Sequence, residues 1–149
     1  MAKEWEDVTC VVCAFNEEPR IAAPVVLLKK VGLAEVIVVD DGSTDGTAEI
    51  ARASGARVIS HPRNEGKGAA LVTGIRAAET GRLVLFDADI IGLTMKHVTE
   101  VVRPVAWGQT SMMHGIWPRR CYAIPGVLKR GLHISGQRAL TRALWDRVP

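Results

Sequence analysis

Residues 38–47 are Val-Val-Asp-Asp-Gly-Ser-Thr-Asp-Gly-Thr, the segment that indicates the fold class most clearly. It begins as an apolar, β-branched run that favours a buried strand, and it passes directly into two carboxylates and a glycine-rich turn. An acidic side chain at the carboxyl end of a strand can accept hydrogen bonds from a base N–H or a ribose hydroxyl. An ordinary Asp-rich turn or helix cap is the alternative, because Asp, Ser, Thr and Gly all favour turns.

Strand-like and helix-like segments alternate through the first ninety positions. Four short apolar runs are predicted as strands: residues 8–14, 35–40, 57–60 and 83–86. Three helices are predicted between them: residues 21–31, a helix that starts within 44–47 and ends at Gly55, and residues 67–79. This order predicts right-handed βαβ crossovers and an α/β fold with a mostly parallel sheet covered on both faces. Ligands of such sheets bind at the carboxyl ends of the strands.

The alternation stops after Asp89. The remaining predicted elements are a helix from Thr94 to Arg103 that Pro104 stops, a strand at 110–116, a basic loop at 117–132 and a helix at 137–148. The last helix would carry an apolar stripe with little sequence left to cover it. We therefore expect self-association through this helix, and a domain that ends before it is complete.

Composition indicates one globular domain. Hydrophobic residues make up 48% and charged residues 23% of the 149, values that exclude a disordered chain. The formal charge of +3, with scattered Lys and Arg, suits a small anionic ligand better than nucleic acid. The sequence has no long uncharged apolar run and no signal-peptide pattern, so we expect a cytoplasmic protein, with a peripheral membrane location left open.

A second acidic signal is Asp87-Ala88-Asp89, directly after the apolar run 83–86. Two carboxylates separated by one small residue suit a hard cation such as Mg²⁺ or Mn²⁺. Phosphate oxygens and water commonly complete the coordination shell of such a cation. A D-x-D also occurs as a plain turn. Its position after a buried strand favours the metal site.

Two further polar segments lie at strand ends. Residues 64–68, Asn-Glu-Gly-Lys-Gly, open a predicted helix, where backbone N–H groups and Lys67 favour phosphate. Residues 14–18, Ala-Phe-Asn-Glu-Glu, follow the first strand. A flexible loop and a helix cap by Asn16 are the respective alternatives. In a doubly wound sheet, all four polar segments would converge on one crevice.

Cysteine, histidine and arginine give weaker signals. Cys10 and Cys13 lie in a predicted strand, where residues three apart face opposite sides, so we expect free thiols. The four histidines lack metal-ligand spacing and are expected on the surface or in loops: His61, His97, His114 and His133. Six basic residues can form a solvated face or hold an acceptor phosphate: Arg119, Arg120, Lys129, Arg130, Arg138 and Arg142.

These motifs resemble those of family 2-like glycosyltransferases with the GT-A fold. Residues 13–17 resemble the family's P-A-[YF]-N-E, residues 38–47 its V-V-D-D-G-S-x-D-G-T, and residues 87–89 its D-x-D. The resemblance implies a GT-A-type, Rossmann-like sheet in a single domain, residues 1–149. Residues 1–90 would form its nucleotide-sugar-binding part and residues 91–149 the start of its acceptor-binding part.

The resemblance also implies a set of site residues. The nucleotide site would comprise Ala14, Phe15, Asn16, Glu17, Asp41, Lys67, Asp87 and Ala88. Asp89 would bind the cofactor, Mg²⁺ or Mn²⁺. Residues 135–138, Ser-Gly-Gln-Arg, are similar to the S-G-F-R of members that use prenyl phosphates, which implies that Arg138 lies near an acceptor phosphate.

The implied activity is transfer of a sugar from a UDP- or GDP-sugar to a phosphate-bearing or hydroxyl acceptor. Prenyl phosphate and phosphoglycerate are the phosphate acceptors that the resemblance suggests, and no catalytic base is identified. A sugar-phosphate nucleotidyltransferase is one rival, although such enzymes usually have a Gly-rich loop and Arg after the first strand. A catalytically incomplete nucleotide-binding fragment is the other.

Overall fold

The computed structural model describes residues 5–115 and 137–148, so the predicted loop at 117–132 and His133 lie outside it. Its centre is a six-stranded sheet with the order β3-β2-β1-β4-β6-β5. The strands are β1 Trp5–Ala14, β2 Leu33–Asp40, β3 Arg57–Ser60, β4 Arg82–Asp87, β5 Met112–His114 and β6 Arg138–Thr141. The first four run parallel, whereas β6 is antiparallel to both β4 and β5. The predicted mostly parallel sheet is confirmed.

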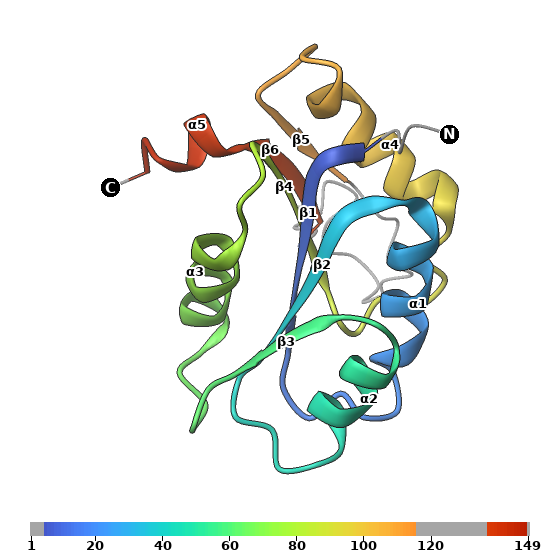
Figure 1. Ribbon diagram of the computed structural model, residues 1–149, viewed down its shortest axis with the longest axis vertical. Coiled ribbons are helices and arrows are strands. Elements are labelled where there is room, and N and C mark those ends of the chain that lie inside the picture. The colour runs from blue at the N-terminus through green and yellow to red at the C-terminus, as the bar shows by residue number, and fades with distance from the viewer. Residues whose placement is uncertain (1–4, 116–136, 149) are drawn as a thin grey trace, which may run out of the picture.

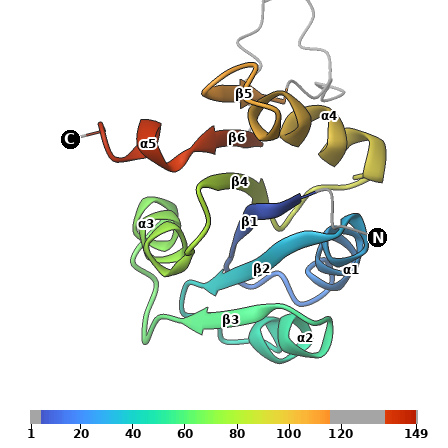
Figure 2. The ribbon, with the colours of Figure 1, turned by 45° about the horizontal axis from the view of Figure 1, so that its top comes forward.

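Helices cover both faces of this sheet (Figures 1 and 2). They are α1 Ala22–Val31, α2 Thr47–Ala53, α3 Lys67–Ala77, α4 Met95–Ala106 and α5 Arg142–Trp145. Side chains of α1, α2 and α4 form one hydrophobic cluster with the sheet, and those of α3 and α5 join the cluster on the other face. The first three helices match their predicted positions, and Gly32 ends α1 with a φ of 87°.

Strand β1 lies at the centre and is apolar on both faces because it is covered on both faces. Val11 packs on the α3 side, whereas Cys10 and Val12 pack on the α1 side. Gly74 lets α3 approach closely, since a Cβ atom there would lie 2.3 Å from Val11 Cγ1. Packing of this closeness fixes α3 against the strand.

Helix α4 begins as predicted but ends later. The Thr94 side chain accepts a hydrogen bond from the His97 N–H in a capping box. Pro104 was expected to stop the helix, but it lies inside α4, which continues to Ala106. Four buried valines, Val98, Val101, Val102 and Val105, anchor the helix on the sheet. Their burial outweighs the single backbone hydrogen bond that proline removes in the last turn.

The predicted helix at 137–148 is wrong. Residues 138–141 form β6, and only Arg142–Trp145 are helical. Ala139 pairs with Val84 and faces one hydrophobic cluster, whereas Leu140 pairs with Leu83 and faces the other. Insertion between β4 and β5 satisfies the backbone hydrogen bonds and buries both side chains, which a surface helix would not achieve. The self-association expected from an exposed stripe therefore loses its basis.

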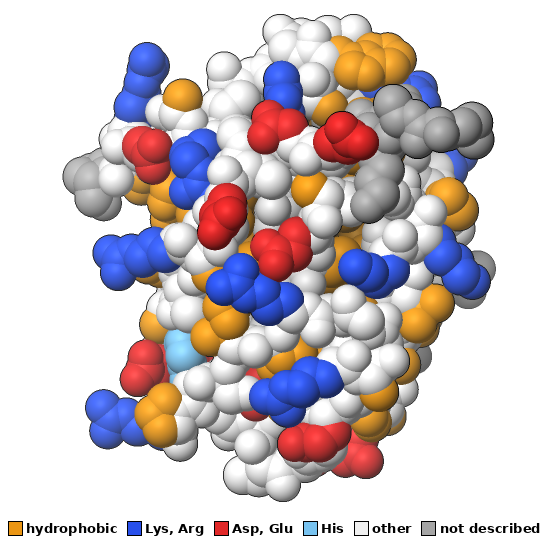
Figure 3. Space-filling view, in the orientation of Figure 1, with side chains coloured by type: hydrophobic (Ala, Val, Ile, Leu, Met, Phe, Trp, Pro, Cys, Tyr) orange, Lys and Arg blue, Asp and Glu red, His pale blue; other side chains and the backbone are white. Residues whose placement is uncertain are grey.

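The surface has mixed character. Figure 3 shows acidic and basic side chains interspersed over one face, without a region dominated by one sign. Within the part of the chain that the structure describes, no helix is long and apolar enough to cross a membrane. The expected cytoplasmic location stays a prediction.

Arg142 is a structural residue at the amino ends of the parallel strands. Its guanidinium donates to three carbonyl oxygens, those of Ile75 at 3.2 Å, Ala78 at 2.6 Å and Thr80 at 3.0 Å. A cation at the C-terminus of α3 also complements the helix dipole. Because these bonds hold the guanidinium, they support neither the solvated face nor the acceptor-phosphate contact that the sequence left open for Arg142.

We predict that Arg142→Ala lowers the free energy of unfolding by about 2–3 kcal/mol, since it leaves carbonyl groups without their charged donor. Urea unfolding followed by circular dichroism measures this change. Arg147→Ala, at an exposed position near the same end of the chain, is the matched control and should change stability by less than about 0.5 kcal/mol. Equal stability of the two variants would contradict the structural role of Arg142.

Candidate functional site

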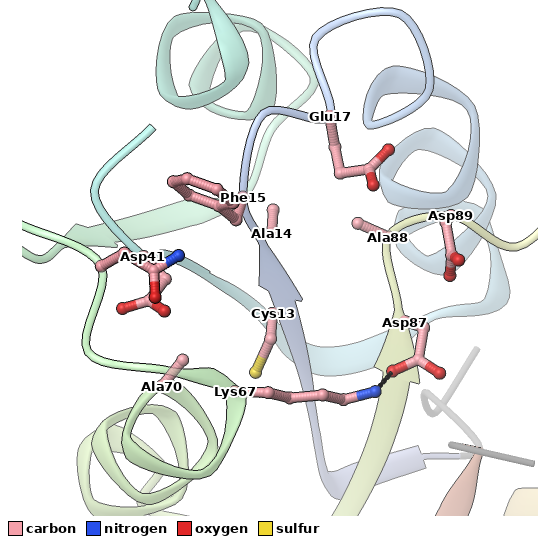
Figure 4. A pocket seen from close by; sticks show the side chains of 11 residues that line it. Cys13, Ala14, Phe15, Glu17, Asp41, Lys67, Ala70, Asp87, Ala88 and Asp89 are labelled. Carbon is pink, nitrogen blue, oxygen red and sulfur yellow. Dashed lines mark hydrogen bonds and ion pairs between the residues drawn. The ribbon is translucent and has the colours of Figure 1, made fainter. Parts of the chain in front are cut away.

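A cavity of about 360 Å³ opens at the carboxyl ends of β1, β2 and β4 (Figure 4). It is lined by Cys13, Ala14, Phe15, Glu17, Asp41, Asn64, Lys67, Ala70, Asp87, Ala88 and Asp89. The strand register explains this convergence, because Ala14 pairs with Asp40 and Cys13 pairs with Asp87. All the predicted nucleotide and metal residues except Asn16 line this cavity.

Asn16 joins two loops outside the lining. Its backbone has a φ of 52°, a left-handed conformation that Asn tolerates better than most residues. Its N–H donates to Ser43 Oγ at 2.9 Å, and its side-chain oxygen accepts from the Thr44 N–H at 2.9 Å. These bonds tie the loop after β1 to the loop after β2 and so position Phe15 and Glu17. The predicted contact of Asn16 with a nucleotide stays a prediction.

Asp41 is a buried carboxylate that organises the loop before α3. Its Oδ1 accepts from the Glu65 N–H at 2.9 Å and lies 2.8 Å from His61 Nδ1, and its Oδ2 accepts from the Gly66 N–H at 2.8 Å. Burial alone would raise the pKa of Asp41, but the hydrogen bonds from Glu65, His61 and Gly66 outweigh it and hold that pKa below its ordinary value. Asp41 is therefore ionised at neutral pH.

This arrangement occupies two backbone N–H groups just before α3, which begins at Lys67, and the predicted phosphate contact of the α3 N-terminus stays a prediction. Backbone N–H groups there were expected to favour a phosphate, but those of Glu65 and Gly66 already donate to Asp41. A phosphate beside the Asp41 carboxylate would meet charge of the same sign. Attraction for phosphate can still come from the first-turn N–H groups of α3, which begins at Lys67, and from the Lys67 side chain, which crosses the cavity (Figure 4).

Lys67 forms an ion pair with Asp87 at the end of β4. The Lys67 side chain is 58% exposed, so screening by water keeps this pair weak and a ligand can replace it. Asp89 lies two residues further along and is exposed at the cavity. Asp87 and Asp89 therefore present carboxylate oxygens on one side of the cavity, opposite Asp41.

The described residues, 5–115 and 137–148, contain no group of three His, Cys, Asp or Glu side chains placed to hold a metal ion. Mg²⁺ is commonly held by only one or two carboxylates, with substrate phosphates and water as further ligands. Asp87 and Asp89 offer two carboxylates of that kind. The site thus fits a cation that binds together with a diphosphate.

The two described cysteines are free thiols, as predicted. They lie on opposite faces of β1, because Cys10 is in the α1-side cluster and Cys13 packs against the α3-side cluster. Burial raises the pKa of Cys10, and burial together with Asp87 and Asp41 raises that of Cys13 to about 12, although Lys67 opposes the rise. Neither thiol is ionised at neutral pH, and their positions on opposite faces of β1 do not favour a shared zinc or redox site.

His61 is the residue of the site that the sequence failed to indicate. It was expected on the surface or in a loop, and it does follow β3 in a loop, but its side chain is only 9% exposed and lies between Asp41 and Thr73. The adjacent ends of β2 and β3 bring it there, because Asp40 pairs with Ser60 and the next residues are Asp41 and His61. The pairing of the consecutive predicted strands 35–40 and 57–60 is the sequence signal that could have placed His61 beside Asp41.

Arg138 lies near the cavity but does not line it. It begins β6 and pairs with Leu85, which precedes Asp87 by two residues and so faces the same side of the sheet. Its Nε is buried without a hydrogen-bond partner. A buried donor without a partner is unusual in proteins and is expected to have a role.

The comparisons with known proteins agree with this geometry. A model of the family described as Glycosyl transferase family 2 matches residues 9–141. The chain is 42% identical over 113 residues to an uncharacterised protein of Methanocaldococcus jannaschii, a match that covers 74% of this chain and 46% of that protein. It is 36% identical over 118 residues to glucosyl-3-phosphoglycerate synthase of Mycobacterium tuberculosis, covering 72% of this chain and 36% of the enzyme.

Solved structures of that M. tuberculosis enzyme share the fold. One crystal structure superposes with a TM-score of 0.77 at 30% identity and covers 96% of this chain and 60% of its own. A complex with Mn²⁺, UDP-glucose and phosphoglyceric acid gives a TM-score of 0.72 at 28% identity, covering 92% and 57%. The chain spans less than half the length of both protein relatives. It has the GT-A fold, and by its family match and these identities it belongs to the family 2 glycosyltransferases.

Proposed function

We propose that this chain binds a UDP-sugar with a divalent cation and forms the donor site of a glycosyltransferase whose acceptor carries a phosphate. One observation carries the proposal: the ends of β1, β2 and β4 bring Ala14, Asp41, Asp87 and Asp89 to one cavity, with Lys67 across it. UDP is favoured over GDP because the related glucosyl-3-phosphoglycerate synthase forms complexes with UDP and UDP-glucose.

The two sides of the cavity suit different parts of the donor. Asp41 Oδ2 has one described hydrogen bond, from the Gly66 N–H, and so can accept another from a base N–H or a ribose hydroxyl. Phe15 lines the same cavity and is 45% exposed, which leaves its ring available to a base. We place the nucleoside beside Asp41 and Phe15, and the diphosphate beside Lys67 and Asp89.

In the transfer, the bond between the anomeric carbon and the diphosphate oxygen breaks, and a bond from that carbon to an acceptor oxygen forms. A bound Mg²⁺ or Mn²⁺ supplies charge neutralisation on the leaving diphosphate. Asp89 and Asp87 would hold the cation. Lys67, released from Asp87, would add positive charge at the diphosphate.

The acceptor is placed on the Arg138 side of the cavity. Arg138 shares a sheet face with Asp87, and its buried Nε can donate to a phosphate oxygen. Phosphoglycerate is favoured over prenyl phosphate because the related enzyme has been crystallised with phosphoglyceric acid. A phosphate that is not itself the nucleophile would anchor the acceptor while one of the acceptor's hydroxyl oxygens attacks and its proton passes to water.

Two other functions are compatible with a nucleotide site on an α/β sheet. A nucleotidyltransferase is disfavoured because the family match covers the cavity residues and because Ala14 and Phe15 follow β1 in place of a Gly-rich loop. An activity assay distinguishes a transferase from a fragment that binds nucleotide without turnover. Release of UDP from UDP-glucose, measured with Mn²⁺ and 3-phosphoglycerate, supports transfer, whereas UDP binding without release supports the fragment.

We predict that UDP binds at least about tenfold more tightly in Mn²⁺ than in EDTA, since two like charges about 4 Å apart repel by about 1–4 kcal/mol. Asp89→Asn should reduce this ratio to about twofold by removing one carboxylate charge. Isothermal titration calorimetry measures both affinities. Asp146→Asn, an exposed carboxylate at the end of α5, is the control and should keep the full ratio. Equal UDP affinity of the wild type in Mn²⁺ and EDTA would exclude the cation site.

We predict that Arg138→Lys weakens 3-phosphoglycerate binding by about tenfold in the presence of UDP and Mn²⁺, because lysine cannot reproduce the fork of guanidinium donors. The affinity for UDP should stay within about twofold, since Arg138 does not line the donor cavity. Calorimetric titration of each ligand measures the two effects. Arg57→Lys, on the far edge strand β3, is the matched control. An unchanged phosphoglycerate affinity in Arg138→Lys would remove Arg138 from the acceptor site.

A further inference from the structure

His61 links three elements through both nitrogens of its ring. Nδ1 lies 2.8 Å from Asp41 Oδ1, at the end of β2, and Nε2 lies 2.9 Å from Thr73 Oγ1, on α3. The backbone N–H of His61 also donates to the carbonyl oxygen of Asp40 at 2.8 Å. A histidine with its ring this well enclosed and with partners on both sides has a fixed orientation.

The partners determine which ring nitrogen carries the proton. Asp41 is ionised and can only accept hydrogen bonds, so His61 Nδ1 must donate to it. In the neutral imidazole, Nε2 then accepts from the Thr73 hydroxyl, which completes a chain from α3 to Asp41. The Glu65 carboxylate is the other charged group nearby, with Oε2 3.8 Å from Nδ1.

The loop before α3, whose backbone N–H groups donate to Asp41, is also restricted by close packing. A Cβ atom on Gly42 would lie 2.4 Å from the carbonyl carbon of Arg63, so the loop backbone packs directly against the turn after β2. Gly66 has a φ of 92°, a conformation that L side chains rarely adopt, and Lys67 follows it as the first residue of α3. The position of Lys67 therefore depends on the Gly66 N–H bond to Asp41.

We propose that His61 and Thr73 are positioning residues for the donor: they orient the Asp41 carboxylate and, through it, the first turn of α3 and Lys67. The proposal rests on the donor-binding function above. Neither residue lines the cavity, so the proposal assigns neither of them a direct contact with the nucleotide. Their effect on nucleotide affinity would pass through Asp41 and the backbone of Glu65 and Gly66.

The first experiment needs no ligand. Long-range ¹⁵N NMR of the imidazole in the unliganded chain at pH 8 should show a protonated Nδ1 and an unprotonated Nε2 for His61. Amide hydrogen exchange of Glu65 and Gly66 should be at least about tenfold faster in Thr73→Val than in the wild type, because the chain that orients their acceptor is broken. Thr73→Ser keeps the hydroxyl and should exchange like the wild type.

The second experiment measures UDP affinity in Mn²⁺ by calorimetry. Thr73→Val should bind UDP at least about fivefold more weakly than the wild type, the loss expected for one hydrogen bond. The UDP affinity of Thr73→Ser should stay within about twofold of the wild type. His61→Asn keeps a donor toward Asp41 but cannot reach Thr73, and should resemble Thr73→Val. Thr99→Val is the matched control, since this threonine on α4 donates to the Met95 carbonyl oxygen at 2.8 Å.

The outcomes separate this proposal from the donor-binding function. A proton on Nε2, or wild-type exchange at Glu65 and Gly66 in Thr73→Val, would overturn the positioning role. Wild-type UDP affinity in both Thr73→Val and His61→Asn would overturn it as well. If the wild type fails to bind UDP, the donor-binding function fails, and with it the role of His61 and Thr73 in donor binding.

Discussion

The hydrogen-bonded register between β1 and its two parallel neighbours determines where the polar side chains of the cavity lie. Ala14 pairs with Asp40 and Cys13 pairs with Asp87, so three strands end at nearly the same level. The residues that follow each strand are polar, and parallel strands place them at one edge of the sheet. Close packing of α3 through Gly74 and of α1 on the other face holds this register from both sides.

Electrostatics then divide the cavity into two regions. Asp41 accepts from two N–H groups at the start of α3, which stabilises its negative charge and removes those donors from any ligand. Asp87 and Asp89 lie on the other side, with Lys67 paired to Asp87. In the proposed function, a nucleotide diphosphate that approaches this second region binds with a cation, and the neutral base and ribose hydrogen-bond to Asp41.

Much of the fold could be predicted because its signals are local. The apolar runs, Gly32 and the capping threonine Thr94 each act within a few residues of their own position. The D-x-D of residues 87–89 and the segment around Asp41 could also be recognised as candidate site residues in the sequence, because each directly follows a predicted buried strand.

The errors arose where tertiary pairing overrides local pattern. Leu140, Leu144 and Val148 have the spacing of a helical stripe, yet residues 138–141 pair with the edge of β4 and join the sheet. His61 is 20 residues from Asp41 and 12 from Thr73, so only the order of the strands brings the three together. Arg142 could be distinguished from a ligand-binding arginine only once the carbonyls at the end of α3 were seen around it.

The carboxyl edge of β1, β2 and β4 is proposed to bind a nucleotide diphosphate. An NMR titration of the ¹⁵N-labelled chain with UDP in Mg²⁺ is the decisive test of this site. We expect the amide signals of Ala14, Asp41, Lys67 and Asp89 to shift together along one binding curve. Signals at the opposite edge, such as those of Thr80 and Arg142, should stay in place. Shifts confined to the opposite edge, or no shifts at millimolar UDP, would contradict the account.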